Sequence, residues 1–397
     1  MHNSVIAAHF IRKLSQLNAT FIHNQIAEHK RYRPVLIYKE QQQLSERSET
    51  LLSNLPNLNC DICQSGLKKT YSDFIYRKFR KLTSEDEKTI LNFLKEHNVS
   101  ICHFHYGTDA GMYLKVIKRV KIPSVVSFYG YDCSSFPSWY FGYGKLYLRR
   151  VFHEADIFLS MSEDMKKDLI ALGCPEEKII VHYHGTDVQK FQFKREYKDS
   201  DPVSLLIVAA LVPQKGHIFL FEALKDVIQK IPDIQLRIVG DSFGKYFYLK
   251  DDFKKFIETN RLSGNVTFLG ALPYLSQEFF EEFKNADIFV HPSVISETGE
   301  KEGIPGTIIE AMASGLPVIT TYHAGIPYII DNRKTGILIK EWDVDALSEA
   351  IINLALDRPA RERIGKNGRE FAVNNLDLKV KEVELEDLYD MVINSNA

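Results

Sequence analysis

Short runs of aliphatic and β-branched residues alternate with amphipathic windows in both halves of the chain, and this alternation constrains the fold most. In the first half, the predicted strands are 5–10, 34–38, 100–105, 124–128, 157–160 and 179–182. In the second half, they are 205–209, 236–239, 266–269 and 288–290. Strands that alternate with helices usually pair in parallel and are covered by helices on both faces. The sequence therefore predicts an α/β protein with two parallel sheets.

Residues 188–202 separate the two halves. The segment is charged, poor in apolar residues and contains Pro202, which is typical of a linker. We expect an N-terminal domain over 1–188 and a C-terminal domain over 203–375. Helical periodicity then continues from 344 to 393 without a further strand, which leaves a last helix over about 380–397.

Two carboxylates, Glu302 and Glu310, flank the start of a predicted helix that ends near Gly315. A helix N-terminus carries free backbone N–H groups and partial positive charge, which suits a phosphate. Carboxylates beside a bound anion repel it, so we expect them to accept hydrogen bonds from neutral hydroxyls. Hydroxyls next to phosphates describe a nucleotide sugar. The alternative is a solvated acidic loop with a helix-capping glutamate.

The composition and the cysteine count indicate in which compartment the protein works. No stretch approaches the roughly 18 apolar residues of a membrane span, and the N-terminus shows no basic leader. The chain has five cysteines, a small and odd number, which favours reduced thiols. We therefore expect a cytoplasmic protein, with the inner face of the membrane as a second location. Cys60 and Cys63 form one C-x-x-C pair. A metal cluster with Cys102, His103 and His105 remains an alternative to ordinary buried thiols.

The first 188 residues are net basic and the remainder is net acidic. Between 71 and 82, basic residues alternate with Phe74, Tyr76 and Phe79. One interpretation is a surface helix that packs its aromatic side chains inward. The other is docking to an anionic membrane face that carries a lipid-linked acceptor. We expect no nucleic acid partner, because the domain is only mildly basic.

The motifs around the acidic pair form a longer pattern. The run from Glu302 to Gly315 resembles the donor-site signature of the retaining group 1 (family 4) glycosyltransferases. Matching motifs follow the family's order in both halves: His103-Phe104-His105-Tyr106-Gly107, Phe128-Tyr129-Gly130-Tyr131-Asp132, His184-Gly185-Thr186-Asp187, Lys215-Gly216-His217, Val239-Gly240-Asp241 and Pro292-Ser293. Thr20-Phe21 and Gln25 resemble the exopolysaccharide branch of the colanic acid and amylovoran type. The likeness covers nearly the whole chain.

The resemblance implies a GT-B fold, in which two Rossmann-like domains face each other across a cleft and the last helix crosses back to the first domain. It implies that Glu310 binds the ribose hydroxyls and that Glu302 and Lys215 act in catalysis at the sugar and the diphosphate. The other implied donor-binding residues are Gly303, Ile304, Pro305, Thr307, Ile308, Gly240, Asp241 and Ala210.

The resemblance also implies acceptor-side residues in the first domain, namely His103, His105, Tyr106 and Asp132. Tyr129, the third expected catalytic residue, occupies the position where the family usually has histidine. Ala210 occupies a position where arginine is common, so Lys215 lacks its usual cationic partner. Arg12 and His184 are candidates to replace that cation.

The expected function is that of a retaining, metal-independent hexosyltransferase-type glycosyltransferase without a separate cofactor. Its substrate is a UDP- or GDP-linked sugar, and its acceptor is a glycan or a lipid-linked sugar in surface polysaccharide or glycolipid biosynthesis. Two alternatives remain. One is a catalytically silent homologue that binds a sugar nucleotide, and the other is a GT-B sugar-nucleotide epimerase.

Overall fold

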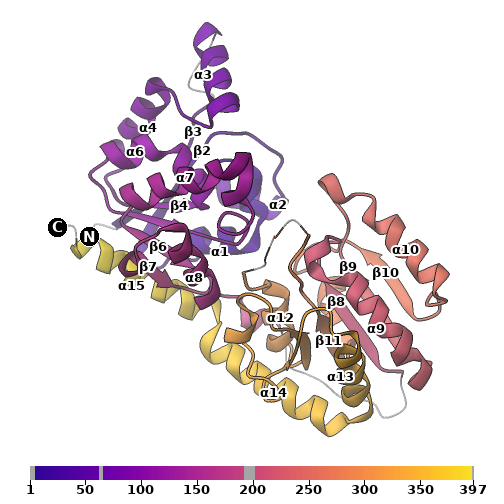
Figure 1. Ribbon diagram of the computed structural model, residues 1–397. Coiled ribbons are helices and arrows are strands. Elements are labelled where there is room, and N and C mark those ends of the chain that lie inside the picture. The colour runs from indigo at the N-terminus through magenta and orange to yellow at the C-terminus, as the bar shows by residue number, and fades with distance from the viewer. Residues whose placement is uncertain are drawn as a thin grey trace. The chain divides into compact units, whose positions relative to one another are not determined.

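The computed structural model describes residues 5–61, 66–191, 202–297, 299, 301 and 303–395. The chain divides into two compact units, Met1–Gly185 with Leu378–Ala397, and Thr186–Asp377 (Figure 1). Each unit contains one sheet, and all the strand pairs in both sheets are parallel. The predicted pair of parallel-sheet α/β domains is therefore confirmed.

The first sheet has seven strands in the order β3-β2-β1-β4-β5-β6-β7. Their bounds are β1 Val5–Phe10, β2 Tyr32–Tyr38, β3 Asn57–Asn59, β4 Val99–His105, β5 Ser124–Ser127, β6 Ile157–Ser160 and β7 Ile179–Val181. The central strands β1 and β4 pair with His9 opposite His103. Since side chains alternate between the faces of a sheet, His105 lies on the same face as His103.

Helices cover both faces of this sheet (Figure 1). They are α1 Thr20–Ala27, α2 Glu46–Ser53, α3 Gly66–Phe79, α4 Ser84–Glu96, α5 Gly107–Met112, α6 Leu114–Arg119, α7 Trp139–Glu154, α8 Glu163–Leu172 and α15 Leu378–Ser395. The C-terminal helix α15 belongs to this unit, because Leu385 and Tyr389 pack with Ala7, Ile101 and Val125 of the central strands.

The second sheet has six strands in the order β10-β9-β8-β11-β12-β13. Their bounds are β8 Ser204–Val208, β9 Gln235–Val239, β10 Val266–Gly270, β11 Ile288–His291, β12 Val318–Thr321 and β13 Ile337–Ile339. The helices of this unit are α9 His217–Lys230, α10 Leu249–Thr259, α11 Gln277–Asn285, α12 Gly306–Ala313, α13 Val344–Leu356 and α14 Arg358–Asn375. An apolar core joins the sheet to α9, α10 and α13.

Several elements differ from the predictions. The short strands β3, β12 and β13 were not expected. Helix α12 ends as predicted. Gly315 has φ 75°, and the N–H groups of Gly315 and Leu316 donate to the carbonyls of Met312 and Ala311. Among the described helices, none combines the length and apolar composition that crossing a lipid bilayer requires.

Candidate active site

The N-terminus of α12 follows directly on the loop with the expected donor-binding residues. Pro305 precedes the first helical turn with an extended backbone (φ −62°, ψ 119°). Gly303 and Ile304 are buried, and the Gly303 carbonyl accepts a hydrogen bond from the Gly325 N–H (3.2 Å). Thr307 and Ile308 lie in the first turn of the helix. The described part of the loop is thus held by backbone contacts. The Ile308 N–H donates to the Pro305 carbonyl (3.0 Å), and the N–H groups of Gly306 and Thr307, which begin the helix, form a place for an anion.

Glu310 lies one turn further along α12 and is only 4% exposed. Its Oε2 has no hydrogen-bond partner among the described residues. Burial raises the pKa of Glu310 to about 7, although a hydrogen bond from Tyr274 works in the opposite direction. A buried carboxyl with a free oxygen is ready to accept hydrogen bonds from a ligand. Its expected partner Glu302 lies outside the described residues.

Lys215 ends a short 3-10 turn, Pro213–Lys215, beyond strand β8. Gly216 follows with φ 71°, and a Cβ added there would lie 1.9 Å from the Pro292 carbonyl oxygen. Only glycine lets this loop approach the end of β11 so closely. Burial and, second, the Lys215 ammonium lower the pKa of His217 to about 3. The positive charge of Lys215 is therefore held at the carboxyl ends of β8 and β11, the edge where ligands bind in such sheets.

Gly240 and Asp241 lie beside Ala209 and Ala210 at the same edge. The Leu211 N–H donates to the Asp241 carbonyl (3.1 Å), and Gly240 has φ 143°. The Asp241 carboxylate pairs with the Lys250 ammonium (2.9 Å), and that hydrogen bond lowers the pKa of Asp241. Lys250 was not singled out in the sequence, because it reaches this edge from α10, nine residues further along the chain.

In the first unit, Asp132 holds the turn that follows β5. Its carboxylate accepts hydrogen bonds from the backbone N–H groups of Gly107 (2.9 Å), Tyr129 (3.1 Å) and Gly130 (3.1 Å). Burial raises the pKa of Asp132 to about 6, although these backbone donors work in the other direction. Asp132 is fully buried, so its place in the structure is to shape the loop that presents Tyr129.

Tyr129 is partly buried, and the side chains of His105, Gln25 and Ser127 lie around its hydroxyl. The hydroxyl oxygen lies 2.8 Å from His105 Nδ1 and 3.0 Å from Gln25 Oε1. The ring packs against Tyr106 (centroids 4.8 Å apart) and Phe21 (4.6 Å). Burial raises the pKa of Tyr129 well above its ordinary value, so the phenol stays neutral.

The expected acceptor-side histidines have no exposed surface. His103 is bonded at both ring nitrogens, to the Tyr389 hydroxyl (2.6 Å) and to Ser127 Oγ (2.7 Å). His105 is bonded to Tyr129 and to His9. Neither histidine presents an atom to a ligand in this structure, which gives no support to the expected direct contact with an acceptor. Of the expected acceptor-side residues, only Tyr106 is partly exposed.

The cysteines do not join these histidines. Among the described residues, the side chains that could together hold a metal ion are His9, His103 and His105. Cys60 and Cys102 are buried and do not belong to that group, and Cys63 lies outside the described residues. The alternative of a mixed Cys/His cluster therefore has no support in the described part of the chain.

The candidates to replace the missing cation lie in the first unit. The Arg12 guanidinium is bound by Asp109 (3.2 Å) and Glu40 (3.1 Å), and the His184 ring stacks on Phe21 (centroids 5.5 Å apart). The expected site residues thus form one group at the edge of each sheet. Tyr274, which reaches Glu310 from the loop before α11, was missed because no motif marks it.

Comparison with known proteins agrees with the resemblance of the sequence motifs. The chain matches the family "Glycosyl transferases group 1" over residues 188–371 and the family "Glycosyltransferase Family 4" over residues 64–190. The amylovoran biosynthesis glycosyltransferase AmsK of Erwinia amylovora is 31% identical over 258 residues, 65% of this chain and 61% of that protein. The putative colanic acid biosynthesis glycosyltransferase WcaL of Escherichia coli is 29% identical over 292 residues, 73% of this chain and 70% of that protein.

Solved structures share the fold over the whole chain. A glycosyltransferase from Rickettsia africae has a TM-score of 0.77 at 18% identity and covers 99% of both chains. Anabaena HepE in complex with UDP-glucose has a TM-score of 0.76 at 15% identity, covering 97% of this chain and 99% of that one. The expected GT-B fold is thereby confirmed.

Proposed function

Because this chain belongs to the group 1 glycosyltransferases, we propose that it transfers a sugar from a UDP- or GDP-linked donor to a glycan or lipid-linked acceptor. We place this reaction in the assembly of a surface polysaccharide, as the names of its amylovoran and colanic acid relatives suggest. We further propose that the transfer retains the anomeric configuration and needs no metal ion, since Lys215 and the α12 N-terminus supply positive charge where the diphosphate would leave.

The observation that carries this proposal is the free oxygen of Glu310. A buried carboxyl oxygen without a hydrogen-bond partner lowers the stability of the ligand-free protein, so we expect it to serve in binding. It can accept two hydrogen bonds from a vicinal diol, whereas a phosphate next to it would be repelled. We therefore assign the ribose hydroxyls to Glu310 and the diphosphate to the N–H groups of the preceding turn.

Lys215 complements that arrangement with a full positive charge. Growing negative charge on a leaving diphosphate is the main electrostatic demand of glycosyl transfer from a nucleotide sugar. In the proposed reaction, Lys215 and the α12 amides stabilise this charge, Glu302 supports the sugar, and Tyr129 contributes a neutral hydroxyl from the first unit. Gly240, Asp241 and Ala210 complete the donor edge of the sheet.

The direct test incubates the purified protein with a panel of UDP- and GDP-sugars and measures free nucleoside diphosphate. We expect slow release without an acceptor, because water replaces the acceptor hydroxyl, and a strong reduction in Glu310→Gln. The matched control is Glu349→Gln, which changes an exposed glutamate on α13. Tight binding without turnover would identify a silent homologue, and an isomerised sugar would identify an epimerase.

A second proposal concerns the surface of α3. Four of its apolar side chains are strongly exposed, namely Leu67 (90%), Tyr71 (60%), Phe74 (53%) and Phe79 (48%). Exposed cationic side chains surround them, namely Lys68, Lys69, Arg77 and Lys78. In Figure 1, α3 stands out from the rest of the first unit. Of the two interpretations of this segment, inward packing does not describe these four residues, and we propose that they contact an anionic membrane surface.

Charge complementarity selects this partner, since aromatic side chains between lysines suit the interface of an anionic bilayer. The test is pelleting with vesicles that contain phosphatidylglycerol or only phosphatidylcholine. We expect salt-sensitive binding to the anionic vesicles alone, and weaker binding for Phe74→Ser. Phe247→Ser removes an aromatic side chain that is 73% exposed on the second unit and serves as the control. Equal binding by both variants would contradict the proposal.

A further inference from the structure

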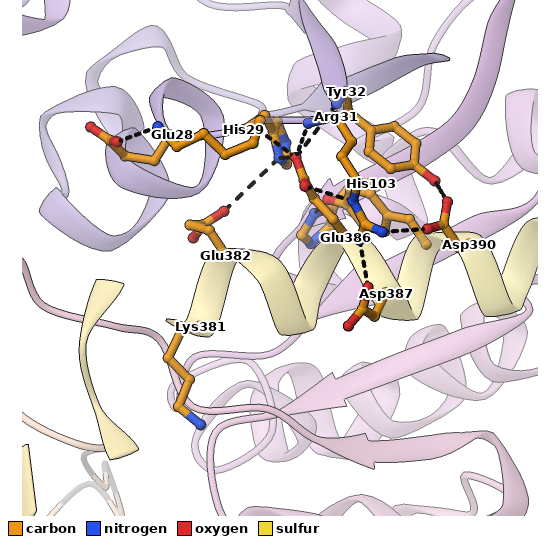
Figure 2. A network of polar contacts seen from close by, with 12 residues as sticks. Glu28, His29, Arg31, Tyr32, His103, Lys381, Glu382, Glu386, Asp387 and Asp390 are labelled. Carbon is orange, nitrogen blue, oxygen red and sulfur yellow. Dashed lines mark hydrogen bonds and ion pairs between the residues drawn. The ribbon is translucent and has the colours of Figure 1, made fainter. Parts of the chain in front are cut away.

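Polar groups in the interior of a protein usually hold its elements together, and Glu386 of α15 is an example. Its carboxylate is buried and accepts hydrogen bonds from the backbone N–H groups of Lys30 (2.6 Å) and Arg31 (2.9 Å) and from Arg31 Nε–H (3.1 Å). Figure 2 shows Arg31 turned toward Glu386. These bonds tie α15 to the turn between α1 and β2, so they account for the burial of the carboxylate. A buried polar group without such bonds needs another explanation.

His217, the first residue of α9 in the second unit, is such a group. It is 1% exposed, and neither of its ring nitrogens has a hydrogen-bond partner among the described residues. The ring stacks on Phe253 of α10, with the centroids 5.4 Å apart and 28° between the planes, and the Phe221 ring lies 6.5 Å away. Apolar packing thus holds the ring in place. The described part of the fold does not use its two polar atoms, which points to a ligand.

His217 lines a cavity of about 590 Å³ in the second unit, a size typical of small-molecule sites. The cavity lies among the start of α9, the start of α10 and the segments that follow β11 and β13. These segments leave the carboxyl ends of parallel strands, the edge where ligands bind in such sheets. Among the described residues, none of those that we assign to donor binding lines this cavity. The cavity is thus a separate place for a ligand at the same edge of the sheet.

Aromatic side chains form much of the cavity wall. Tyr246, Tyr248, Phe253 and Trp342 line it, and Trp342 and Tyr248 are 55% and 46% exposed. The Trp342 ring packs against Phe219 (centroids 5.6 Å apart). Its backbone has φ 63°, a left-handed conformation that is costly for a bulky residue. The surrounding structure therefore holds Trp342 in place, although more than half of the residue is exposed. The electron-rich face of such a ring attracts polarised C–H groups, which the flat face of a sugar ring offers.

The polar groups of the cavity match a neutral ligand with hydroxyl groups. Because burial and, second, the Lys215 ammonium lower the pKa of His217 to about 3, its ring is neutral and offers one N–H donor and one acceptor nitrogen. Sugar hydroxyls can serve both atoms, since each hydroxyl donates and accepts. Lys245 and Glu297 are the charged side chains that line the described part of the cavity. Their charges are opposite, so the cavity does not select an anion such as a nucleotide.

We propose that this cavity is a second sugar-binding site, which holds a neutral sugar residue of a glycan against Trp342 and bonds its hydroxyls through His217. The choice of a glycan rests on the proposed function, since a polysaccharide is what the enzyme would extend. The presence of a ligand site does not rest on it, because the cavity and the two histidine nitrogens are features of the fold. A glycan held there would remain on the enzyme whether or not a nucleotide sugar occupies the donor site.

Tryptophan fluorescence offers a local test, because Trp139 and Trp342 are the two tryptophans of the chain. In a Trp139→Phe variant of the full chain, the remaining Trp342 reports on the cavity. The probes are the neutral disaccharides maltose, cellobiose, lactose and mannobiose. We expect at least one of them to change the Trp342 fluorescence in a saturable way, with a Kd on the order of 1 mM, because few polar contacts hold the sugar. The absence of a saturable change with all of these disaccharides would overturn the proposal, and a change with uridine or guanosine instead would identify a nucleobase site.

Further variants in the Trp139→Phe background locate the binding. His217→Leu should weaken disaccharide binding at least about tenfold and should not lower the Tm, because a leucine side chain suits the apolar packing around the ring. The matched control is Phe247→Ala, since Phe247 is 73% exposed beside Tyr248 but does not line the described part of the cavity. Glu310→Gln should also bind the disaccharide as its parent does, because Glu310 belongs to the donor site. Equal affinities for His217→Leu and its parent would overturn the role of His217.

Saturation-transfer NMR extends the test to Trp342→Ala, which lacks the fluorescent reporter. Because Trp342 is largely exposed, this variant should keep the fold and lose the disaccharide signal, whereas a retained signal would place the sugar elsewhere and overturn the proposal. A protein that binds a disaccharide at Trp342 but releases no nucleoside diphosphate from any nucleotide sugar would contradict the proposed function and leave this site standing. Turnover of a nucleotide sugar without any disaccharide effect at Trp342 would overturn this site alone.

Discussion

Replacing Glu310 by glutamine is expected to stabilise the ligand-free protein increasingly as the pH rises, although it removes a group that we assign to substrate binding. The pKa of Glu310 is raised by burial from 4.5 to about 7. Between these two pH values, the folded protein keeps a proton that the unfolded chain releases. Stability therefore falls as the pH rises through this window. Glutamine has nearly the same shape and no charge, so the variant escapes this loss.

The magnitude follows from the difference in proton affinity. Each tenfold change in proton affinity corresponds to about 1.4 kcal/mol, so the full penalty on the wild type is about 3 kcal/mol above pH 7. Between pH 5 and pH 8, the stability advantage of Glu310→Gln should grow by about 2 to 3 kcal/mol. For a unit of this size, that corresponds to a relative increase in Tm of about 5 to 10 °C.

Urea and thermal unfolding of wild type, Glu310→Gln and Glu349→Gln at pH 5, 6, 7 and 8 measure this difference. Glu349 is exposed on α13, so its variant should follow the wild-type curve at every pH. Parallel curves for wild type and Glu310→Gln across the whole range would refute the reasoning, because they would mean that the Glu310 carboxyl ionises as easily when folded as when unfolded.

Three further predictions concern other residues of the candidate site. Lys215→Ala should weaken the binding of a nucleoside diphosphate at least about tenfold and leave that of the nucleoside unchanged in calorimetry, and equal losses would contradict the phosphate role. Gly240→Ala should lower the free energy of unfolding by roughly 2 to 4 kcal/mol, because its Cβ would lie 1.9 Å from the Ala209 carbonyl oxygen. Gly244→Ala is the control for the steric clash, because a Cβ added at Gly244 has no atom within 4 Å. Tyr129→His should alter kcat, and an unchanged rate would reduce Tyr129 to a packing role.

Much of the architecture could be predicted because its signals are local. The buried strands 5–10 and 205–209 are read from their apolar runs, and the end of α12 is read from Gly315, whose positive φ suits glycine. The strands Asn57–Asn59 and Ile337–Ile339 have three residues each. Their identity as strands depends on pairing with neighbours rather than on any pattern of their own, so the sequence did not indicate them.

In the candidate site too, some residues could be predicted from the sequence and others could not. Contiguous motifs such as the one around Glu310 carry their own geometry, since a loop and a helix turn fix the positions of neighbouring residues. The contacts of the Tyr129 hydroxyl with His105 and Gln25 join segments that are far apart in the chain, and no short motif contains them. His103 and His105 illustrate the limit, because the motif that marks them does not tell whether they face a ligand or the interior.

The most direct test of the central claim is calorimetric titration with UDP and GDP and with their 2′,3′-dideoxy forms. If Glu310 holds the ribose diol, wild type should bind one of the two ribonucleotides and lose at least about tenfold in affinity for its dideoxy form. Glu310→Gln should bind both forms with similar, weaker affinity. A wild-type protein that binds the ribose and dideoxy forms equally, or binds neither UDP nor GDP, would contradict the account.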